Sequence, residues 1–371
     1  MANMNCPGVT IDDFKNIIKA QMIEGNTRPI FGLGLGGIGK SEAIMNLAEE
    51  LGIGYVDIRL LLYNETDLKG IPYPNADHTK TVWLQNSILP TVETHGEKGI
   101  LVFDEVTSCM RSVRTAAYQL LNERKLGEYS LPDGWLVVCL GNGIDDGGDF
   151  NGMEGNFLNR CSVYDILPSV NTWCDWALEN DINPLITGYI RFKSDDFHTF
   201  SADNDMELFA SPRSWKAVSD ILKYNDINDK ITQYRIMGSV GVKVGQTFMA
   251  FSKFENVAVK AEDILEGKAK HNIKDKEALM ITVSSLVKLV RDELRLNKGI
   301  EPSEELIEHI ANTINWLIDL KCDGAAETKL MAFKDMFRAN DTVLKIIMNP
   351  KFASKCTKFK EFVASYKNIF K

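Results

Sequence analysis

The glycine-rich stretch FGLGLGGIGKSEA, residues 31–43, constrains the fold of this chain more than any other feature. Gly34, Gly36 and Gly39 match the G-x-G-x-x-G pattern of dinucleotide-binding loops, and Asp57 lies 18 residues after Gly39 as a candidate partner for a ribose hydroxyl. The same stretch also reads G-x-x-x-x-G-K-S, the P-loop pattern of nucleoside triphosphatases. Both patterns require a loop between a β-strand and an α-helix, so the rest of the chain has to distinguish them.

The sequence around this loop alternates short β-rich runs with helical stretches. Between about residues 28 and 170, apolar runs such as ILVF and WLVVCL are separated by segments with apolar residues three and four positions apart. This alternation predicts an α/β fold in which helices cover both faces of a parallel sheet. From about residue 171 the β-rich runs fade and helical spacing continues, so we expect the second half to be mostly α-helical.

A triphosphate needs more than a glycine-rich loop, and the residues after the glycines fit that need. Glycines let the backbone amides of residues 34–39 approach phosphate oxygens, and a helix beginning near Lys40 adds its positive dipole end. Lys40 would contact the β- and γ-phosphates, and the hydroxyl of Ser41 would bind Mg²⁺. The expected phosphate-binding residues are Gly34, Gly36, Gly37, Ile38, Gly39, Lys40, Ser41 and Glu42.

Two further apolar runs end in polar residues that fit the same site. ILVFDE ends in Asp104, which would hold Mg²⁺, and Glu105, which would polarise the attacking water. WLVVCLGN ends in Asn142, whose amide could help to position that water. Taken alone, Asp104 and Glu105 could be a strand end that turns into solvent, and Asn142 could be an ordinary turn residue. Together with the P-loop pattern they favour triphosphate binding, which leaves Asp57 as a surface carboxylate.

Composition and charge restrict the class of partner and the location of the chain. With 51 acidic and 42 basic residues, the net charge of −9 would repel a phosphate backbone, so nucleic acid is disfavoured. Seven cysteines, an odd number without C-x-x-C spacing, indicate reduced thiols and a cytoplasmic location. We expect no signal peptide and no membrane span, and the scattered histidines indicate no metal other than magnesium.

With these motifs in this order, the chain resembles the AAA+ ATPases, and within them the MoxR-like branch of bacteria and phages. The resemblance covers about residues 28–255. GLGGIGKS and ILVFDE look like the Walker A and Walker B motifs, and LGN places Asn142 at the sensor 1 position. FLNRC places Arg160 at the position of the arginine finger, and SPRSW places Arg213 at sensor 2. The stretches DLKG and LLNERKLGE also look MoxR-like.

The resemblance implies a P-loop NTPase fold of three parts. They are an α/β nucleotide-binding domain at residues 1–200, a helical lid at 201–260 and a C-terminal helical extension at 261–371. It also implies ATP hydrolysis with Mg²⁺ in a homo-oligomeric ring, with a hexamer as the expected form. Arg160 would act on the nucleotide of a neighbouring subunit, and Arg213 on that of its own. As isolated residues, both arginines would instead be ascribed to surface ion pairs.

On this resemblance, we expect the ring to remodel a protein client together with a von Willebrand A-domain partner. Two alternatives stay open. A DNA-acting motor is disfavoured by the net charge of −9. A nucleotide-dependent assembly switch would bind partners without processive work. No membrane contact is expected from the sequence.

Three segments outside the motifs each allow more than one interpretation. Residues 70–85, with Tyr73 and Trp83, form either a hairpin whose aromatic rings pack on the domain or, by the resemblance, a substrate-facing hairpin. The acidic segment 143–156 fits a mobile loop near a subunit interface better than a calcium site, because the terminal Glu of a calcium loop is missing. The basic, amphipathic stretch 351–371 should dock on the helical domain rather than on a membrane.

Overall fold

The computed structural model describes most of the chain, and the part that it describes divides into two compact units. The described residues are 6–84, 86–143, 155–201, 208–322, 324–338 and 341–365. Unit 1 takes those within 1–172, 198–207 and 211–213, and unit 2 takes those within 173–197, 208–210 and 214–371. The domain boundaries near residues 200 and 260 remain predictions.

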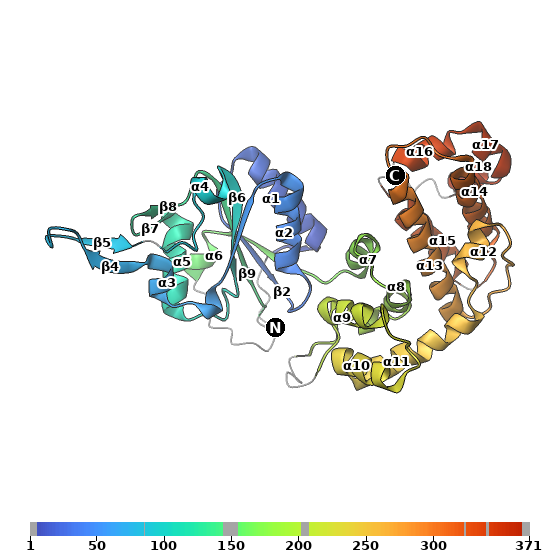
Figure 1. The fold of residues 1–371 in the computed structure, drawn as a ribbon, viewed down its shortest axis with the longest axis horizontal. Helices are drawn as coiled ribbons and strands as arrows, with labels where there is room; N and C mark the ends of the chain where they lie inside the picture. The colour runs from blue at the N-terminus through green and yellow to red at the C-terminus, as the bar shows by residue number, and fades with distance from the viewer. Residues whose placement is uncertain are drawn as a thin grey trace. The chain divides into compact units, whose positions relative to one another are not determined.

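Unit 1 is built on a six-stranded sheet in which all neighbouring strands are parallel (Figure 1). In sheet order the strands are β1 (Gly8–Val9), β10 (Ser162–Ile166), β2 (Ile30–Gly34), β9 (Gly134–Gly141), β6 (Lys98–Asp104) and β3 (Gly54–Arg59). This order confirms the predicted alternation of strands and helices. A connection between parallel strands has to cross a face of the sheet, and a helix fits there. Strand β9 separates the P-loop strand β2 from the ILVFD strand β6.

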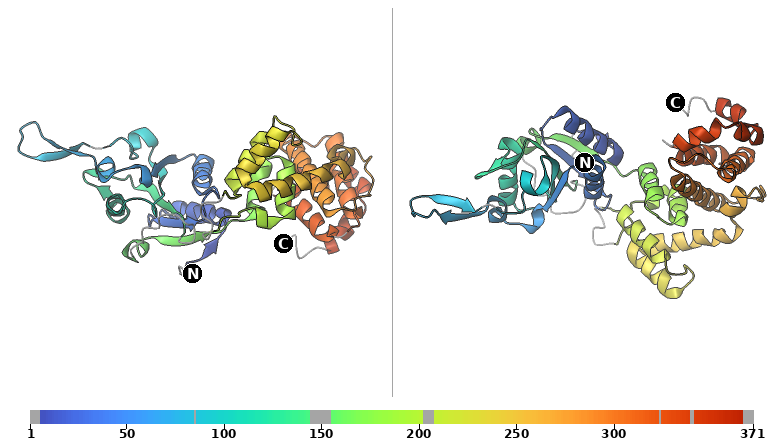
Figure 2. Two further views of the ribbon diagram at one scale, coloured as in Figure 1. Left: turned by 90° about the horizontal axis from the view of Figure 1, so that it is seen from below. Right: turned by 45° about the horizontal axis from the view of Figure 1, so that its top comes forward.

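Helices cover both faces of this sheet (Figures 1 and 2). The main ones are α1 (Ile11–Glu24) and α2 (Lys40–Leu51) on one face and α5 (Arg111–Glu123) on the other. Residues 100–103 of β6 form an uninterrupted apolar run because Ile100 and Val102 are buried beneath α1 and α2, while Leu101 and Phe103 are buried beneath α5. Burial of each such side chain stabilises the unit by about 1.5–3 kcal/mol.

Short elements surround the sheet, and the longest excursion is a hairpin. It consists of antiparallel strands β4 (Ile71–Pro74) and β5 (Thr81–Leu84), and it projects away from the sheet (Figures 1 and 2). The hairpin is confirmed. Tyr73 is 57% exposed, whereas Trp83 is partly buried and lies beside Gly127, where an added Cβ would be 4.0 Å from its Cγ. The remaining elements are η1 (Leu60–Leu62), α3 (Glu65–Lys69), α4 (Val92–His95), β7 (Lys125–Leu126), β8 (Tyr129–Ser130) and α6 (Gly155–Leu158).

Every described secondary-structure element of unit 2 is a helix, as the spacing of its apolar residues predicts. Two of its α-helices, α7 (Val170–Glu179) and α9 (Pro212–Leu222), begin with residues of unit 1. The other described α-helices are α8 (Pro184–Phe192), α10 (Lys230–Val240), α11 (Val242–Ser252), α12 (Ala261–Leu265), α13 (Lys276–Leu296), α14 (Glu304–Asp319), α15 (Ala325–Phe337), α16 (Asp341–Ile347), α17 (Pro350–Lys355) and α18 (Phe359–Ser365). The 3₁₀ helices among the described residues of this unit are η3 (Ser194–Asp196) and η5 (Lys253–Val257). Helix α13 packs against α8, α12 and α15 and so forms the centre of the unit.

The C-terminal stretch docks within unit 2, as predicted. Phe352, Cys356 and Phe362 are buried in the same apolar cluster as the inner faces of α13 and α14. Residues 366–371 lie outside the described residues, as does most of the acidic segment 143–156. No described helix has both the length and the apolar character needed to cross a bilayer.

The cysteines are free thiols, and most of them are buried in one unit or the other. The buried ones are Cys109, Cys139 and Cys161 in unit 1 and Cys174 and Cys356 in unit 2. Cys6 and Cys322 are partly exposed. Burial raises the pKa of the Cys139 thiol well above its ordinary value and raises that of Cys174 as well.

Candidate functional site

The P-loop lies between β2 and α2, and its glycines meet different requirements. Gly37 and Gly39 have φ angles of +78° and +90°, which glycine adopts without strain. Gly34 is needed for close packing, because a Cβ there would lie 2.5 Å from the carbonyl oxygen of Ile166 on β10. A Cβ on Gly36 would have no neighbouring atom within 4 Å. The loop therefore combines a turn that needs glycine with two positions, Gly36 and Gly39, where an added Cβ would meet open space.

Helix α2 begins at the end of this loop. Its N-cap residue is Gly39, which has no side chain to cap the first turn. A helix N-terminus of this kind attracts anions, because its backbone N–H groups and its dipole both favour negative charge. Ile38 is packed into the apolar cluster beneath the loop, whereas Glu42 is exposed on the first turn of the helix. The geometry is thus suited to a phosphate group.

Lys40 is buried at the edge of the sheet, where it joins the P-loop to β9. Its Nζ donates hydrogen bonds to the carbonyl oxygens of Gly34 at 2.6 Å and Leu35 at 3.0 Å, and to Oδ1 of Asn142 at 3.2 Å. Only 8% of Lys40 is exposed. A buried ammonium group requires such acceptors. The structure therefore brings together two of the predicted site residues, Lys40 and Asn142, which are 102 positions apart.

Ser41 and Asp104 form the second link across the site. The hydroxyl of Ser41 donates a 2.6 Å hydrogen bond to Oδ2 of Asp104, at the end of β6. Hydroxyl and carboxylate oxygens are ligands that Mg²⁺ accepts, usually together with phosphate oxygens. The described residues contain no group of three or more His, Cys, Asp or Glu side chains able to hold a metal by themselves. The pair fits a magnesium ion that is shared with a bound phosphate.

Glu105 adopts a backbone conformation that is unusual for its residue type. Its φ angle is +58°, in the left-handed region, where a non-glycine residue is strained. Hydrogen bonds hold the turn on both sides: its N–H donates to Oδ1 of Asp104 at 2.8 Å, and its carbonyl oxygen accepts from the N–H groups of Ser108 and Cys109. Strain of this kind is common where a side chain must be aimed at a ligand.

Thr107 fixes the position of Asn142, a role that the sequence did not indicate. Its Oγ1 accepts a 3.1 Å hydrogen bond from the backbone N–H of Asn142, and Thr107 is only 1% exposed. The contact is close, because a Cβ added at Gly141 would lie 2.7 Å from Cγ2 of Thr107. The turn after Glu105 and the end of β9 are therefore held together directly.

His198 and Arg213 supply further contacts to the P-loop within unit 1. The backbone N–H of Arg213 donates to the carbonyl oxygen of Gly37 at 3.1 Å, while its side chain is exposed. Nε2 of His198 lies 3.0 Å from the carbonyl oxygen of Gly36, so this nitrogen carries the proton that it donates. Burial lowers the pKa of His198, and nearby Lys40 lowers it further, although the hydrogen bond to Gly36 opposes this. His198 was not predicted from the sequence.

Arg160 is placed differently from the other predicted residues. It follows α6, and its guanidinium lies 4.6 Å from the centroid of the Tyr118 ring on α5, in a cation–π contact. The described hydrogen bonds and ion pairs do not join it to the P-loop of its own chain. The structure thus brings together Lys40, Ser41, Asp104 and Asn142, with Glu105 beside them, but not Arg160.

Asp57 lies on β3, the strand next to β6, and not beside the glycines. Asp57 is exposed, as expected of a surface carboxylate; desolvation of its carboxyl group by the surrounding atoms nevertheless raises its pKa, and the nearby carboxylate of Asp104 raises it further, while Arg59 acts in the opposite direction. The hydroxyl of Tyr55, on the same strand, donates a 3.4 Å hydrogen bond to the carbonyl oxygen of Ser41. The negative charge of Asp57 therefore adds to that of Asp104, and a divalent cation would stabilise both carboxylates.

Comparison with known proteins does not assign a function to this chain. No protein-family model matches the chain, and no curated protein does. Among solved structures, the chain is similar to an assigned ATPase from Cytophaga hutchinsonii, with 12% identity over 88% of this chain and 81% of that one and a TM-score of 0.33. It is also similar to a RuvB variant from Thermotoga maritima, with 13% identity over 69% of this chain and 77% of that one and a TM-score of 0.35. Likenesses at this level do not bear on substrate, assembly or partner.

Proposed function

We propose that this chain is an ATP-hydrolysing protein of the AAA+ class. The observation that carries the proposal is the Ser41–Asp104 hydrogen bond, together with the contact of Lys40 with Asn142. These contacts join the P-loop to the ends of β6 and β9. They bring together a cationic group on Lys40, metal ligands on Ser41 and Asp104 and an amide on Asn142, which are the groups that a bound triphosphate needs. A dinucleotide site needs neither the lysine nor the serine.

The residues of the site would divide the reaction between them. Lys40 and the N-terminus of α2 would hold the phosphate oxygens, and Ser41 and Asp104 would hold Mg²⁺. When bound, Mg²⁺ neutralises the charge on the β- and γ-phosphate oxygens. Glu105 would accept a hydrogen bond from the attacking water and polarise it, and Asn142 would keep that water in line. The fixed turn around Glu105 supports this role, because positioning supplies much of the rate enhancement in phosphoryl transfer.

The finer proposal is a MoxR-like ring, with a hexamer as the expected form, that remodels a protein client with a von Willebrand A-domain partner. Arg160 would complete the site of a neighbouring subunit, since it has no described hydrogen bond or ion pair to its own P-loop. Arg213 would report the state of the nucleotide, because its backbone already contacts Gly37. Support for this level of detail comes from the sequence motifs.

The catalytic proposal is tested by Glu105→Gln. The substitution keeps the size of the side chain but removes the carboxylate, so ATP turnover should fall on the order of 10²–10⁴-fold while ATP binding persists. Glu97→Gln, at an exposed glutamate of unit 1, is the matched control and should leave turnover unchanged. Turnover measured by phosphate release and binding measured with a fluorescent ATP analogue distinguish the two effects. Unchanged turnover in Glu105→Gln would remove this residue from its role.

A mixing experiment tests the shared site. Arg160→Ala subunits and Glu105→Gln subunits should each be inactive alone, and mixed rings should recover part of the turnover, because some interfaces then combine an intact base with an intact arginine. Absence of recovery in rings that are shown to mix would contradict action on a neighbouring subunit.

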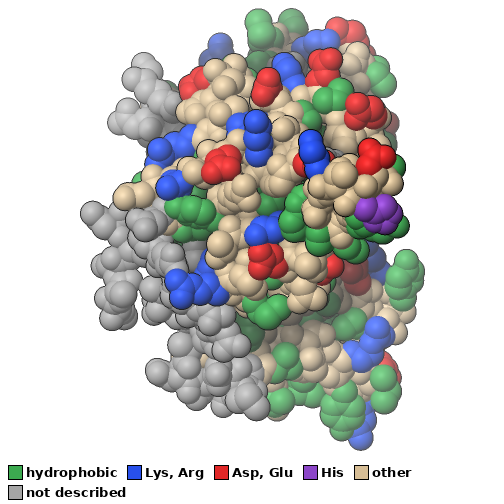
Figure 3. Space-filling view, turned by 90° about the vertical axis from the view of Figure 1, so that its left-hand side faces the viewer, with side chains coloured by type: hydrophobic (Ala, Val, Ile, Leu, Met, Phe, Trp, Pro, Cys, Tyr) green, Lys and Arg blue, Asp and Glu red, His purple; other side chains and the backbone are tan. Residues whose placement is uncertain are grey.

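The alternatives make different predictions for the same assays. On the face shown in Figure 3, basic and acidic side chains are interspersed, and the described residues there form no continuous basic stripe. Turnover that rises when DNA is added would nevertheless favour a DNA-acting motor over a protein remodeller. Slow turnover that no client changes, with ring formation on ATP binding alone, would favour an assembly switch.

A further inference from the structure

The turn that carries Arg160 lies at the edge of the sheet away from the P-loop. Strands β10 and β2 run parallel, with Ser162 opposite Ile30 at their amino ends. Arg160 comes just before β10, whereas the P-loop follows Gly34, at the carboxyl end of β2. Strand residues advance about 3.3 Å each, so the two ends of β2 are roughly 13 Å apart. This placement supports a role for Arg160 at a nucleotide site other than that of its own chain.

Arg28 fixes the main chain of this turn. Its Nη2 donates hydrogen bonds to the carbonyl oxygen of Asn159 at 2.9 Å and to that of Cys161 at 3.1 Å. These two residues stand on either side of Arg160 in the chain. Arginine suits such a contact because its N–H donors are held in one rigid plane. A single side chain from a distant part of the sequence therefore holds the backbone on both sides of Arg160.

Arg28 is itself held in place by its surroundings. Its backbone N–H donates to Oδ1 of Asn26 at 3.0 Å, and its carbonyl oxygen accepts from the side-chain amide of Gln21, a buried residue of α1. At the next position, the carbonyl oxygen of Pro29 accepts a 2.9 Å hydrogen bond from the N–H of Ser162. Arg28 therefore connects the turn to α1 and to the start of β2, which are both parts of the packed sheet.

Tyr118 restricts the side chain of Arg160. Its ring centroid lies 4.6 Å from Cζ of Arg160, and the ring also lies beside Phe157, with centroids 6.1 Å apart. Phe157 is buried against Phe31 of β2, with centroids 5.7 Å apart, so the aromatic group belongs to the core of the unit. A cation–π contact orients a guanidinium without neutralising its charge. Arg160 is therefore oriented and still able to stabilise an anion.

From these contacts we propose that Arg28 and Tyr118 are positioning residues, which hold Arg160 ready for the triphosphate of a neighbouring subunit. Arg28 fixes the main chain, and Tyr118 restricts the side chain. An arginine that is already held loses less conformational entropy when two subunits meet, and its charge is presented in a fixed orientation. The inference rests on the proposed shared site and names two residues on which that site depends.

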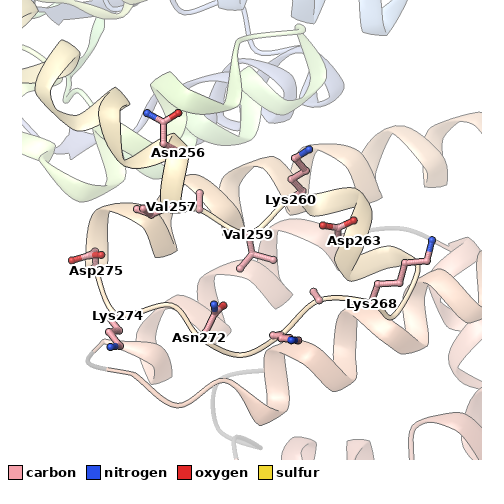
Figure 4. Close-up of a pocket in the computed structure, with 12 residues that line it drawn as sticks. Asn256, Val257, Val259, Lys260, Asp263, Lys268, Asn272, Lys274 and Asp275 are labelled. Carbon is pink, nitrogen blue, oxygen red and sulfur yellow. The ribbon is translucent and has the colours of Figure 1, made fainter.

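The first test is Arg28→Met in the full-length chain. Methionine keeps an unbranched stem but has no N–H group to donate, so kcat should fall on the order of tenfold while ATP binding persists. Arg28→Lys retains a charged donor and should recover part of the loss. Arg124→Met is the matched control, because Arg124 also donates to backbone carbonyl oxygens of unit 1, those of Pro132 and Trp135, and kcat of the folded protein should stay unchanged. Lys274→Met, at the hollow of unit 2 drawn in Figure 4, controls for the loss of one positive charge and should also leave kcat unchanged.

Mixed rings separate a positioning role from damage within one subunit. Arg28→Met subunits mixed with Glu105→Gln subunits should regain turnover, because some interfaces then combine an intact base with a correctly held Arg160. If Arg28→Met instead damaged the nucleotide site of its own subunit, mixing would not help, since the Glu105→Gln site also lacks its base. Absence of recovery in rings that are shown to mix would therefore overturn the inference.

Tyr118 is tested by a pair of variants. Tyr118→Leu removes the aromatic ring, and kcat should fall about threefold. Tyr118→Phe should keep full kcat, because the face of the ring and not the hydroxyl contacts Arg160. An equal loss in both variants would contradict the role of the ring.

Hydrogen exchange without ATP measures the positioning independently of turnover. The N–H groups of residues 160–162, which donate to carbonyl oxygens of Phe157, Leu158 and Pro29, should exchange on the order of tenfold faster in Arg28→Met than in Arg124→Met. Full turnover in Arg160→Ala would overturn the proposed shared site and this inference with it. An inactive Arg160→Ala together with full turnover in Arg28→Met, or unchanged exchange in Arg28→Met, would overturn this inference alone.

Discussion

The two units place their charged groups in opposite ways. At the sheet edge of unit 1, Ser41 and Asp104 are positioned by the first turn of α2 and the end of β6, and both remain partly exposed. In unit 2, Arg191 of α8 and Asp335 of α15 form an ion pair among packed helices, with only 7% of each side chain exposed. Burial raises the pKa of Asp335, although Arg191 acts in the opposite direction.

This difference separates groups placed for a ligand from groups placed by packing. The edge of unit 1 keeps a strained residue, Glu105, and polar atoms that face solvent, which stability alone would not favour. The pair in unit 2 satisfies its own charges and offers little to a ligand. Changes at the sheet edge should therefore alter turnover more than stability, and changes at the buried pair should do the reverse.

The largest expected effect on stability comes from Arg191→Met. Removal of the guanidinium leaves the carboxylate of Asp335 buried without its partner, which should lower the free energy of unfolding of unit 2 by about 3–5 kcal/mol. Denaturant unfolding followed by hydrogen exchange in α13 and α15 would measure it. Arg295→Met is the control, because Arg295 is half exposed and its ion pair should contribute at most about 1 kcal/mol.

The same prediction has an internal check. Arg191→Met/Asp335→Leu removes both charges and should recover most of the lost stability, because no unpaired charge remains. ATP turnover per folded molecule should stay unchanged in all of these variants. A fall in turnover with stability intact would break the contrast between the two units.

Ser41→Ala should show the opposite pattern. Loss of the hydroxyl should raise the Mg²⁺ concentration needed for half-maximal turnover by about 10–100-fold, while the free energy of unfolding changes by about 1 kcal/mol or less. Ser239→Ala, at a partly exposed helix position, is the matched control. A magnesium titration of the initial rate measures the effect. An unchanged Mg²⁺ requirement would show that Ser41 serves only to hold Asp104.

Thr107→Val tests a position where stability and turnover should change together. The substitution keeps the shape of the side chain but removes the acceptor for the N–H of Asn142, which should cost about 0.5–1.5 kcal/mol. Turnover should also fall, because the amide of Asn142 would lose its fixed position. Thr107→Ser retains the hydroxyl and should restore turnover. If Val and Ser behave alike, the hydrogen bond has no role in positioning.

The smallest expected effect is a pH dependence from His198. Since the folded-state pKa of His198 is lowered below its ordinary value of 6.5, the unfolded chain binds this proton first as the pH falls. The contribution of neutral His198 to the free energy of unfolding is fully present above pH 6.5, and it is lost as the pH falls from that value towards the folded-state pKa. His198→Gln should therefore make the stability of unit 1 less dependent on pH between about pH 7 and 5. Urea unfolding at several pH values measures this slope, and an unchanged slope would contradict the assignment.

The sequence predicts the parts of the site that follow strand ends. The residues after ILVF and WLVVCL could be placed near the P-loop because parallel strands present their carboxyl ends at one edge of the sheet. His198 could not, since a single histidine 162 positions from Gly36 carries no local pattern. Thr107 and the pair of Arg191 with Asp335 were missed for the same reason, because their partners are set by packing between elements distant in the chain. The predicted roles of Arg160 and Arg213 still rest on sequence motifs.

The buried thiols allow the opening of each unit to be measured separately by chemical labelling. Cys139 lies inside unit 1, and Cys174 lies inside unit 2; burial raises the pKa of both, so neither presents a reactive thiolate in the folded chain. A thiol reagent can modify them only when the surrounding unit opens, whereas the partly exposed Cys6 and Cys322 do not need such opening. Mass spectrometry of pulse-labelled protein would then report how often each unit opens, and whether the two open together or independently.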